Sequence, residues 1–578
     1  MSIVSLTGDA RSSIDIARLR RWANDIGFEI TDAADAEDYL LLLRSLEAVL
    51  ESIKESPDYI DPSLEPCPTT EPRTYWRPAA EDNPLNAWSH RCSLRASSCT
   101  SNLLSGKTIA IKDNISVGGL PTTLGTFPEM LSGNGTFPIS PIDASVVSRV
   151  LAAGAVIKGS ATCESFCASP LSFTSATGPV HQPLLRGHTS GGSSSGCCAL
   201  VAASVLPQEV REPLGETCQL AIGSDQAGSV RIPACFNGIY GLKPTRGLVP
   251  YTGAASMAPM IDHLGPIASN LEDIAALLKV TAGYDGLDSR MTPESPLIHQ
   301  VKNYPRILAD FREGLLNHDH PGRRMRIGML KESFTLPGVS AEVRDTVQKA
   351  TTTFFKLAGA EVVTLSIPLH LDGPSIWTAS TRPSMSEWLC QGKPSGYLSY
   401  LPPHLRPKWP PTQETYELLN SSNPAVINIM LSGKLVHEES GTGVEAKAHR
   451  KVLELRAAYD RAFEGVDILV TPCAPTIAMP HPPSKNDRGE KCGVLDRLKV
   501  AVGLTNNTCP FNVTGHPAMS VPCGFLPAAG HEEVKLPVGM QIIGKRWDDE
   551  SVILAAALFE EGRRLDTTEA LTRQLEAR

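Results

Sequence analysis

Apolar residues in the first 75 positions of the chain recur at helical spacing. A first predicted helix follows Ser12 and Ser13, which can cap it, and it carries Ile14, Ala17, Leu19 and Trp22. A second predicted helix repeats apolar residues at i, i+3, i+4 and i+7, at Leu42, Leu43, Leu46, Val49, Leu50 and Ile53. Two helices alone cannot bury both stripes, so we expect residues 1–75 to form an all-α extension that docks on the main body or on a second subunit. Prolines between positions 57 and 72 predict an extended connector after it.

From residue 76 onward, short apolar runs alternate with helical patterns. Residues 108–111 (TIAI) predict a buried strand, as do residues 155–157 and 220–222. Residues 144–153 predict a helix that ends at Gly154. This alternation favours an α/β fold in which helices cover both faces of a mixed central β-sheet. We therefore expect residues 76–578 to form one catalytic domain behind the small helical extension.

Charge and cysteine content narrow the functional classes. The 578-residue chain carries a formal net charge of −9, whereas nucleic-acid binding needs a basic surface. We expect no membrane partner either, because no run approaches the roughly 18 apolar residues of a membrane span and the N-terminus lacks the pattern of a signal peptide. The fourteen cysteines are scattered without a disulfide framework, which predicts a reduced, cytoplasmic protein. Cys163, Cys167 and His188 make only a weak metal site, because a second pair at zinc-site spacing is absent.

Several familiar functional motifs are absent, incomplete or preceded by the wrong kind of sequence. No GxGxxG follows a strand, and Gly106-Lys107-Thr108 lacks the glycine that a phosphate loop requires at position 101. Residues 192–196 (GSSSG) match the GxSxG nucleophile elbow in form only. The residues before them are polar and rich in glycine, whereas the elbow needs a buried strand there.

Two segments rich in glycine and serine, together with one lysine, can carry chemistry. Residues 190–196 lead straight into an apolar run, which predicts an ordered loop at a helix N-terminus rather than a flexible linker. Residues 223–233 leave a strand with small residues before Ser229, a pattern that lets successive amides point at one developing oxyanion. A tight turn with no catalytic role would show the same pattern of small residues. Lys112 ends a buried strand, where it is either a snorkelling surface residue or a buried amine kept neutral to accept a proton.

The order of these segments resembles the amidase signature family. The resemblance rests on residues 110–114 (AIKDN), on GGSSSG at 191–196 and on GSDQAGSVRIPACFNGIYGLKPTRGLVP at 223–250. Residues 261–266 (IDHLGP), 513–517 (VTGHP) and 536–541 (LPVGMQ) extend it over nearly the whole chain. The helical extension, NPLNAW at 83–88 and NTCPFNVTGHPAMSVP at 507–522 are most similar to the nitrile-pathway amidases of bacteria.

This resemblance implies a mechanism. Ser229 would be the acylated nucleophile, Ser193 a proton-bridging serine held by a cis peptide bond, and Lys112 the general base. The backbone amides of Gln226, Ala227, Gly228 and Ser229 would form the oxyanion hole. Lys112 would take a proton from Ser193 as Ser193 takes one from Ser229, and water would then hydrolyse the acyl-enzyme. No cofactor or metal is implied.

The chain departs from the family pattern at three places. Ala227 and Ser195 replace glycines, and a side chain there would crowd the loop if φ were positive. Residues 208–219 form an insertion between the two serines that we expect to loop out beyond the helix. None of these departures removes a reacting group.

The resemblance leaves the substrate open. It favours an amidase that hydrolyses small carboxamides to a carboxylic acid and ammonia or an amine, acting as a homodimer joined through the N-terminal helices. Esters, carbamates (urethanes) or anilides would fit the same triad, because a serine acyl-enzyme does not choose the leaving group. A glutaminase subunit of a tRNA-dependent amidotransferase is a third hypothesis, against which the helical extension and the acidic charge argue.

Overall fold

The computed structural model describes residue 6 and residues 12–131, 135–316, 325–483, 485, 489–490 and 492–576. The chain divides into two compact units, Met1–Asp61 and Pro62–Arg578. No helix in the described part of the chain combines the length and the apolar character needed to cross a bilayer.

The first unit is a pair of helices, α1 (Ile16–Ile26) and α2 (Ala33–Glu55). Asp15 caps α1 by accepting a hydrogen bond from the Arg18 amide at 2.8 Å, so the expected cap by Ser12 and Ser13 is wrong. An aspartate directly before the first turn accepts from that turn's free amides. Buried residues from both helices form a small common core at Ile14, Leu19, Ala36 and Leu40. Further along α2 the predicted stripe is solvent-exposed at Leu46, Leu50 and Ile53.

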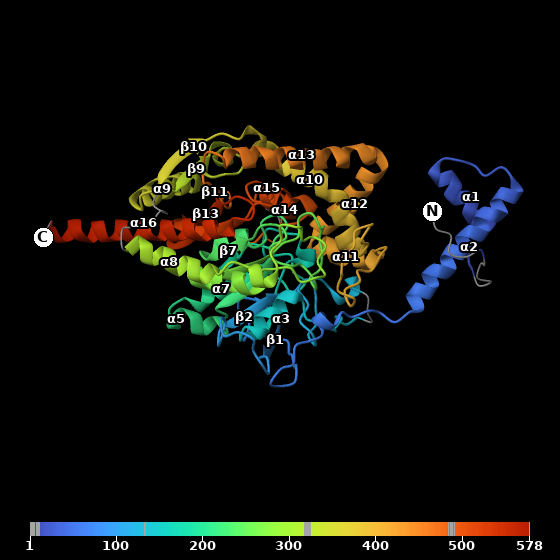
Figure 1. The fold of residues 1–578 in the computed structure, drawn as a ribbon, viewed down its shortest axis with the longest axis horizontal. Coiled ribbons are helices and arrows are strands. Elements are labelled where there is room, and N and C mark those ends of the chain that lie inside the picture. The colour runs from blue at the N-terminus through green and yellow to red at the C-terminus, as the bar shows by residue number, and fades with distance from the viewer. Residues whose placement is uncertain are drawn as a thin grey trace. The chain divides into compact units, whose positions relative to one another are not determined.

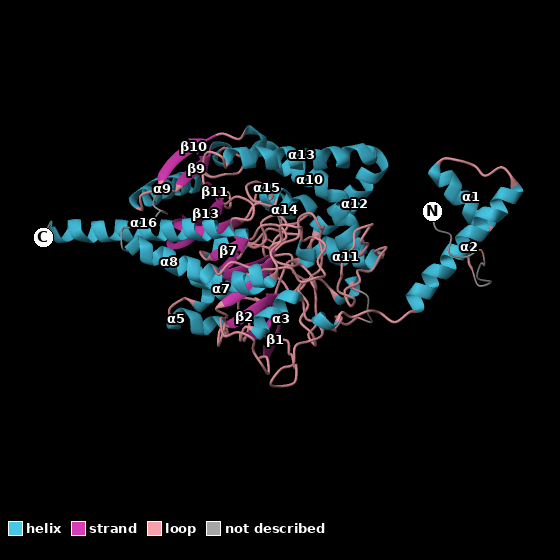
Figure 2. Ribbon diagram, viewed as in Figure 1, coloured by secondary structure: helices cyan, strands magenta, loops and turns pink. Residues whose placement is uncertain are grey.

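The second unit is built on one large mixed sheet (Figure 2). Within the described residues, eleven strands lie in the order β1-β3-β2-β6-β8-β7-β12-β13-β11-β9-β10. Strands β2, β3 and β6 are parallel to one another, as are β9, β10 and β11, and antiparallel pairs join the two sets. A two-stranded ribbon, β4-β5, lies outside the sheet. The strands are β1 Trp88–Leu94, β2 Thr108–Lys112, β3 Val156–Ala161, β4 His181–Gln182, β5 Leu185–Thr189, β6 Leu220–Ser224, β7 Tyr240–Lys243, β8 Leu264–Ala268, β9 Arg326–Leu330, β10 Glu361–Leu365, β11 Ile468–Pro472, β12 Ala518–Ala528 and β13 His531–Ile543.

Helices cover both faces of this sheet, which confirms the predicted fold class. The α-helices of this unit are α3 Ser145–Ala152, α4 Ser195–Ser204, α5 Gln208–Arg211, α6 Arg231–Asn237, α7 Leu271–Thr281, α8 Tyr304–Leu316, α9 Ala341–Leu357, α10 Gly373–Met385, α11 Gln413–Ser422, α12 Pro424–Leu435, α13 Gly441–Ala462, α14 Val494–Leu498, α15 Pro510–Thr514 and α16 Asp549–Glu576. Figure 1 shows α3 and α7 over the part of the sheet that contains β2 and β7. The strands predicted at 108–111, 155–157 and 220–222 are β2, β3 and β6, and the helix predicted at 144–153 is α3.

Alternating side chains of the central strands enter different cores. Ile109 and Ile111 of β2 pack in the core that α3, α7, α8, α9 and α16 share. Ala110, between them, packs against α4 on the other face. Because side chains alternate along a strand, Lys112 follows Ala110 to the α4 face. The fold therefore brings the Lys112 amine to the side of the sheet on which the serine-rich loop before α4 lies.

The connector between the two predicted parts is not free chain. Leu64 is fully buried, and Arg73 forms an ion pair with the buried Asp143 at 2.7 Å. These contacts place residues from Pro62 onward in the second compact unit.

Candidate active site

Lys112 lies at the carboxyl end of β2 and is completely buried. Its Nζ is 2.8 Å from Ser193 Oγ, 2.9 Å from Ser224 Oγ and 3.2 Å from the Ser224 carbonyl oxygen. Within the described residues no carboxylate forms an ion pair with this amine, although most buried lysines have such a partner. The lysine is therefore not a snorkelling surface residue, and its nitrogen is held among hydroxyl groups.

Two buried carboxyl groups flank this region. Burial raises the pKa of Asp113 to about 6 and that of Glu164 to about 7. Glu164 accepts hydrogen bonds from the amide and hydroxyl of Thr174 and from the Ser195 hydroxyl. It thereby supports the loop that holds Ser193, and it lies close enough that a Cβ on Gly192 would stand 2.9 Å from its Cγ.

Ser193 belongs to the loop between β5 and α4, and the Gly192–Ser193 peptide bond is cis. The strand before this loop pairs only with β4 in the small ribbon, so the buried sheet strand that a nucleophile elbow needs is absent from the described chain at this point. The middle serine of that motif, Ser194, is fully buried, and its hydroxyl donates to the Ser224 carbonyl at 3.3 Å. The elbow interpretation is thus excluded by the local structure.

Ser229 lies between β6 and α6, where it lines a pocket of about 210 Å³. Its hydroxyl has no hydrogen-bond partner among the described residues, so it is free to meet a ligand. The loops of the two serines are joined by the Ser194 amide, which donates to the Ser229 carbonyl at 3.1 Å. No hydrogen bond links the Ser193 and Ser229 hydroxyls in the described chain, whereas the one between Lys112 and Ser193 is formed.

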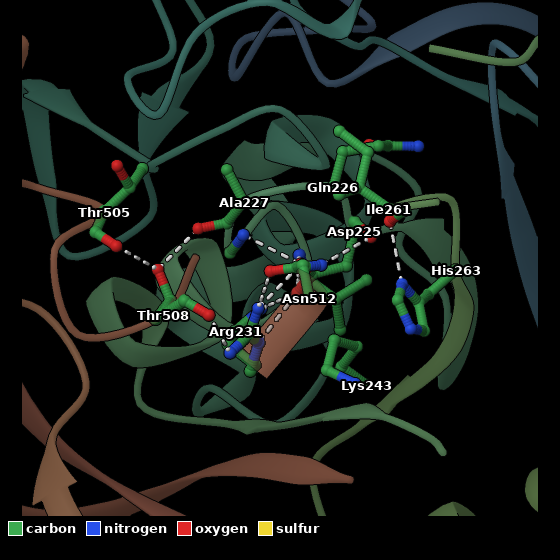
Figure 3. Close-up of polar contacts among 12 residues, drawn as sticks. Asp225, Gln226, Ala227, Arg231, Lys243, Ile261, His263, Thr505, Thr508 and Asn512 are labelled. Carbon is green, nitrogen blue, oxygen red and sulfur yellow. Dashed lines mark hydrogen bonds and ion pairs between the residues drawn. The ribbon is translucent and has the colours of Figure 1, made fainter. Parts of the chain in front are cut away.

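An ion pair shapes the loop that leads to Ser229. The fully buried Asp225 accepts from the Gly228 amide at 2.7 Å and from Nε and Nη2 of Arg231 at 2.9 and 2.8 Å. The Arg231 guanidinium outweighs burial and holds the pKa of Asp225 well below its usual range. Asn512 of α15 joins both residues (Figure 3). The loop therefore surrounds a carboxylate that stays ionised, that of Asp225.

Three successive carbonyl groups of this loop each accept a hydrogen bond from a side chain outside the loop. Asn512 Nδ2 donates to the Asp225 carbonyl at 3.0 Å, and Trp377 Nε1 donates to that of Gln226 at 3.0 Å. The Thr508 hydroxyl donates to the Ala227 carbonyl at 2.5 Å (Figure 3). Since a peptide carbonyl and the following N–H point in opposite directions, the amides of Gln226, Ala227 and Gly228 point away from these three outside donors.

The four amides expected to form the oxyanion hole differ in their hydrogen bonds. The Gly228 amide is occupied, because the Asp225 carboxylate accepts its hydrogen bond. The amides of Gln226, Ala227 and Ser229 donate to no described residue. Three backbone donors therefore remain beside the Ser229 hydroxyl.

The two glycine replacements do not strain these loops. Gly228 has a positive φ of 133°, but neither Ala227 nor Ser195 lies among the described residues with left-handed backbone. Ser195 is the first residue of α4, where its buried hydroxyl donates to Glu164 at 2.9 Å. The crowding expected at a positive φ therefore does not arise.

The insertion at 208–219 is partly ordered rather than a free loop. It forms α5 and a 3-10 turn, Glu212–Leu214. Glu216 then pairs with Lys158 at 2.7 Å and also with Arg91, and its carbonyl accepts from Trp88 Nε1 at 2.9 Å. The insertion is therefore fastened to β1 and β3.

The pocket beside Ser229 is mostly apolar. Its walls include the residues Cys167, Ala168, Ser169, Pro170, Gly192, Gln226, Ala227, Ile232, Met257, Trp377, Arg382, Met385, Ala425, Asn428, Ile429, Ala501 and Thr505. Among the described residues, no group of three metal-ligating side chains is arranged to hold an ion, so Cys163, Cys167 and His188 do not form the metal site considered from the sequence. A hydrogen bond from the Cys163 thiol lowers the pKa of Cys167, which makes Cys167 the second nucleophilic group at the pocket.

Sequence reasoning assigned no role to Asp225, Arg231, Asn512, Thr508 or Trp377. Four of them lie in the conspicuous segments 223–250 and 507–522. Asp225 and Arg231 are charges of opposite sign six positions apart with no other charge between them, which was an available signal for the pair. Trp377 lies outside those segments, and no local pattern marks it.

Comparison with known proteins places the chain among related sequences. The amidase family model matches residues 85–553. An enantioselective amidase of Rhodococcus rhodochrous is 34% identical over 495 residues, covering 84% of this chain and 85% of that protein. A glutamyl-tRNA(Gln) amidotransferase subunit of Methanosarcina mazei is 33% identical over 79% of this chain and 84% of its own length. The solved 6-aminohexanoate cyclic dimer hydrolase shares the fold, with a TM-score of 0.60 and 22% identity over 79% of this chain and 84% of its own.

Proposed function

This chain belongs to the amidase family, and from that premise we propose that Ser229, Ser193 and Lys112 carry out its hydrolysis of amides. Ser229 attacks the amide carbonyl and becomes acylated, the amine or ammonia leaves, and water then releases the carboxylic acid. The observation that carries the proposal is the 2.8 Å distance between Nζ of the buried Lys112 and Oγ of Ser193, 81 positions later in the chain.

Lys112 acts as the base in its neutral form. A neutral amine has two N–H donors and one lone pair. The Ser224 carbonyl and hydroxyl can take the two donors, which leaves the lone pair for the proton of Ser193. The hydroxyl of Ser193 is then free to accept a proton from Ser229. Because catalytic hydrogen bonds often close only in the substrate complex, we expect Ser229 to turn toward Ser193 when the amide enters.

The oxyanion is stabilised by the amides of Gln226, Ala227 and Ser229. Fixed donors aimed at a developing charge need no reorganisation during the reaction, and removing one typically costs about 10²–10³ in kcat. Asp225, Trp377 and Thr508 hold these donors in place, the first through Gly228 and the other two through carbonyl groups.

The substrate is a small carboxamide. Two alternative substrate classes would use the same site. The pocket volume of about 210 Å³ suits a small acyl group, and esters, carbamates or anilides would form the same acyl-enzyme. The likeness to a glutamyl-tRNA(Gln) amidotransferase component favours glutamine hydrolysis for a partner as the second candidate.

We propose further that two copies associate through the helices of the first unit in the cytoplasm. Leu46, Leu50 and Ile53 of α2 are more than half exposed, and such an apolar stripe is typical of an interface. All fourteen cysteines are unpaired, as a reducing compartment favours.

The test is turnover by the purified chain without any partner. An amide, an ester and a carbamate with the same acyl group are compared, together with glutamine. Lys112→Met and Ser229→Ala should lose hydrolysis by about 10²–10⁴ in kcat/KM, whereas Lys158→Met, a lysine of the neighbouring strand β3, should retain it. If glutamine were the one substrate hydrolysed, and if ammonia were released only after a partner protein was added, the amidotransferase role would be favoured instead.

A further inference from the structure

Arg382 is the one charged residue among those that line the pocket beside Ser229. It lies near the end of α10, the helix whose Trp377 donates to the carbonyl of Gln226. The same pocket wall contains several apolar side chains, including Met385, Ile429 and Met257. The pocket therefore combines a nucleophile, an apolar wall and a single cation.

The guanidinium of Arg382 has neither a hydrogen bond nor an ion pair with any described residue. Other buried or half-buried arginines of the chain differ in this respect. Arg231 pairs with Asp225, Arg290 pairs with Asp262 and Asp288, and Arg149 donates to three carbonyl groups. The lack of a partner at Arg382 is thus specific to the pocket and is not a general feature of the fold.

An unpaired guanidinium in an apolar wall is unfavourable. Burial lowers the pKa of Arg382, yet an arginine stays protonated in proteins, so its charge and five N–H donors need a partner from elsewhere. The described pocket wall contains no acidic side chain that could supply one. The remaining partners are water in the open pocket and a ligand that displaces this water.

We propose that Arg382 binds a carboxylate of the substrate, so that the preferred substrates are amides that also carry a carboxylate group. This inference rests on the proposed amide hydrolysis at Ser229 and names its substrate class. The planar fork of a guanidinium matches a carboxylate through two parallel hydrogen bonds. A phosphate would need further cations, and the described pocket wall holds no other. Arg382 is then a specificity-determining residue, while the bond-breaking chemistry stays with Ser229.

The first experiment measures substrate preference. Monoamides of straight-chain dicarboxylic acids, varied in chain length, are each compared with an amide of equal length that ends in a methyl group. At the best chain length, the wild-type kcat/KM should be higher for the amide that carries a carboxylate than for the amide that ends in a methyl group. In Arg382→Met the ratio of the two kcat/KM values should fall by about 30-fold or more, as truncation of a buried charge partner does, mainly through KM. Arg382→Lys should recover part of this preference, and the half-buried Arg344→Met, outside the pocket, is the matched control.

A binding measurement keeps the inference testable independently of catalysis. The acid amide is titrated calorimetrically into Ser229→Ala and into Ser229→Ala with Arg382→Met, after circular dichroism shows both to be folded. Tight binding to the first and at least tenfold weaker binding to the second supports the carboxylate site even if turnover fails. Equal binding to both, or an unchanged preference ratio in Arg382→Met, would overturn it. Failure of the proposed function is seen separately, as an absence of hydrolysis of both amides by the wild type.

Discussion

Arg231 and Asp225 form a fully buried ion pair in which Nη2 lies 2.8 Å from Oδ1 and Nε lies 2.9 Å from Oδ2. The pair joins the end of β6 to the start of α6, and Ser229 lies between its two members. The same carboxylate accepts the Gly228 amide. The ion pair thus fixes the path of the backbone on both sides of the nucleophile.

Replacing Asp225 by Asn should destabilise the protein and slow catalysis together. The guanidinium of Arg231 would remain buried without its counter-charge, which typically costs about 3–5 kcal/mol of unfolding free energy. The loss is measured by chemical denaturation and by kcat. Asp345→Asn, which removes an exposed partner of Arg344, should change stability by less than about 1 kcal/mol. If Asp225→Asn proved as stable as the wild type, the ion pair would not organise this loop.

Two neighbouring substitutions should have opposite outcomes. In Gly228→Ala the new Cβ would overlap Thr508 Oγ1 at a φ of 133°, a conformation that favours glycine. The loop must shift, and kcat should fall by about 10² or more, as for loss of an oxyanion donor. Ala227→Gly should stay within about threefold of the wild type, since φ at Ala227 is unstrained. Steady-state kinetics of both variants give the comparison, and equal activity in the two would contradict it.

Glu164 should make the protein less stable at higher pH. Burial raises its pKa from 4.5 to about 7, so its contribution to stability is fully present below pH 4.5 and is lost as the pH rises through 7. The full loss is on the order of 3 kcal/mol. Glu164→Gln does not titrate, and it should therefore lose less stability between pH 5 and pH 8 than the wild type does.

The measurement for Glu164 is denaturant unfolding at both pH values. The exposed Glu361→Gln serves as the control and should keep the wild-type difference. A Glu164→Gln variant whose stability changes with pH as steeply as the wild type would show that this carboxyl is not the group responsible.

Local patterns in the sequence predicted the secondary structure around the site well. The strand β2 and the helix α3 follow from short apolar runs and a terminal glycine, which depend on nearby residues only. The cap of α1 was misplaced because Ser12, Ser13 and Asp15 are all good cap residues, and only the backbone conformation distinguishes them. The side-chain types of these three residues therefore gave no basis for choosing which one caps the helix.

The parts of the site that escaped prediction depend on contacts distant in the chain. Trp377 reaches the Gln226 carbonyl from 151 positions away, and Thr508 reaches Ala227 from 281 positions away. The small residues before Ser229 indicated inward amides, but not that the Asp225 side chain would occupy the one on Gly228. Arg382 carried no signal at all, since an arginine in a helix is ordinarily exposed and only the pocket makes it unusual.

The most direct test of the central claim identifies the atom that becomes acylated. The protein is mixed with an anilide of a slowly hydrolysed acid, quenched in acid within the first turnover and analysed by intact mass and peptide mapping. We expect one added acyl group on Ser229, absent from Ser229→Ala and strongly reduced in Lys112→Met. An acyl group on Cys167 instead, or full turnover by Ser229→Ala, would contradict it.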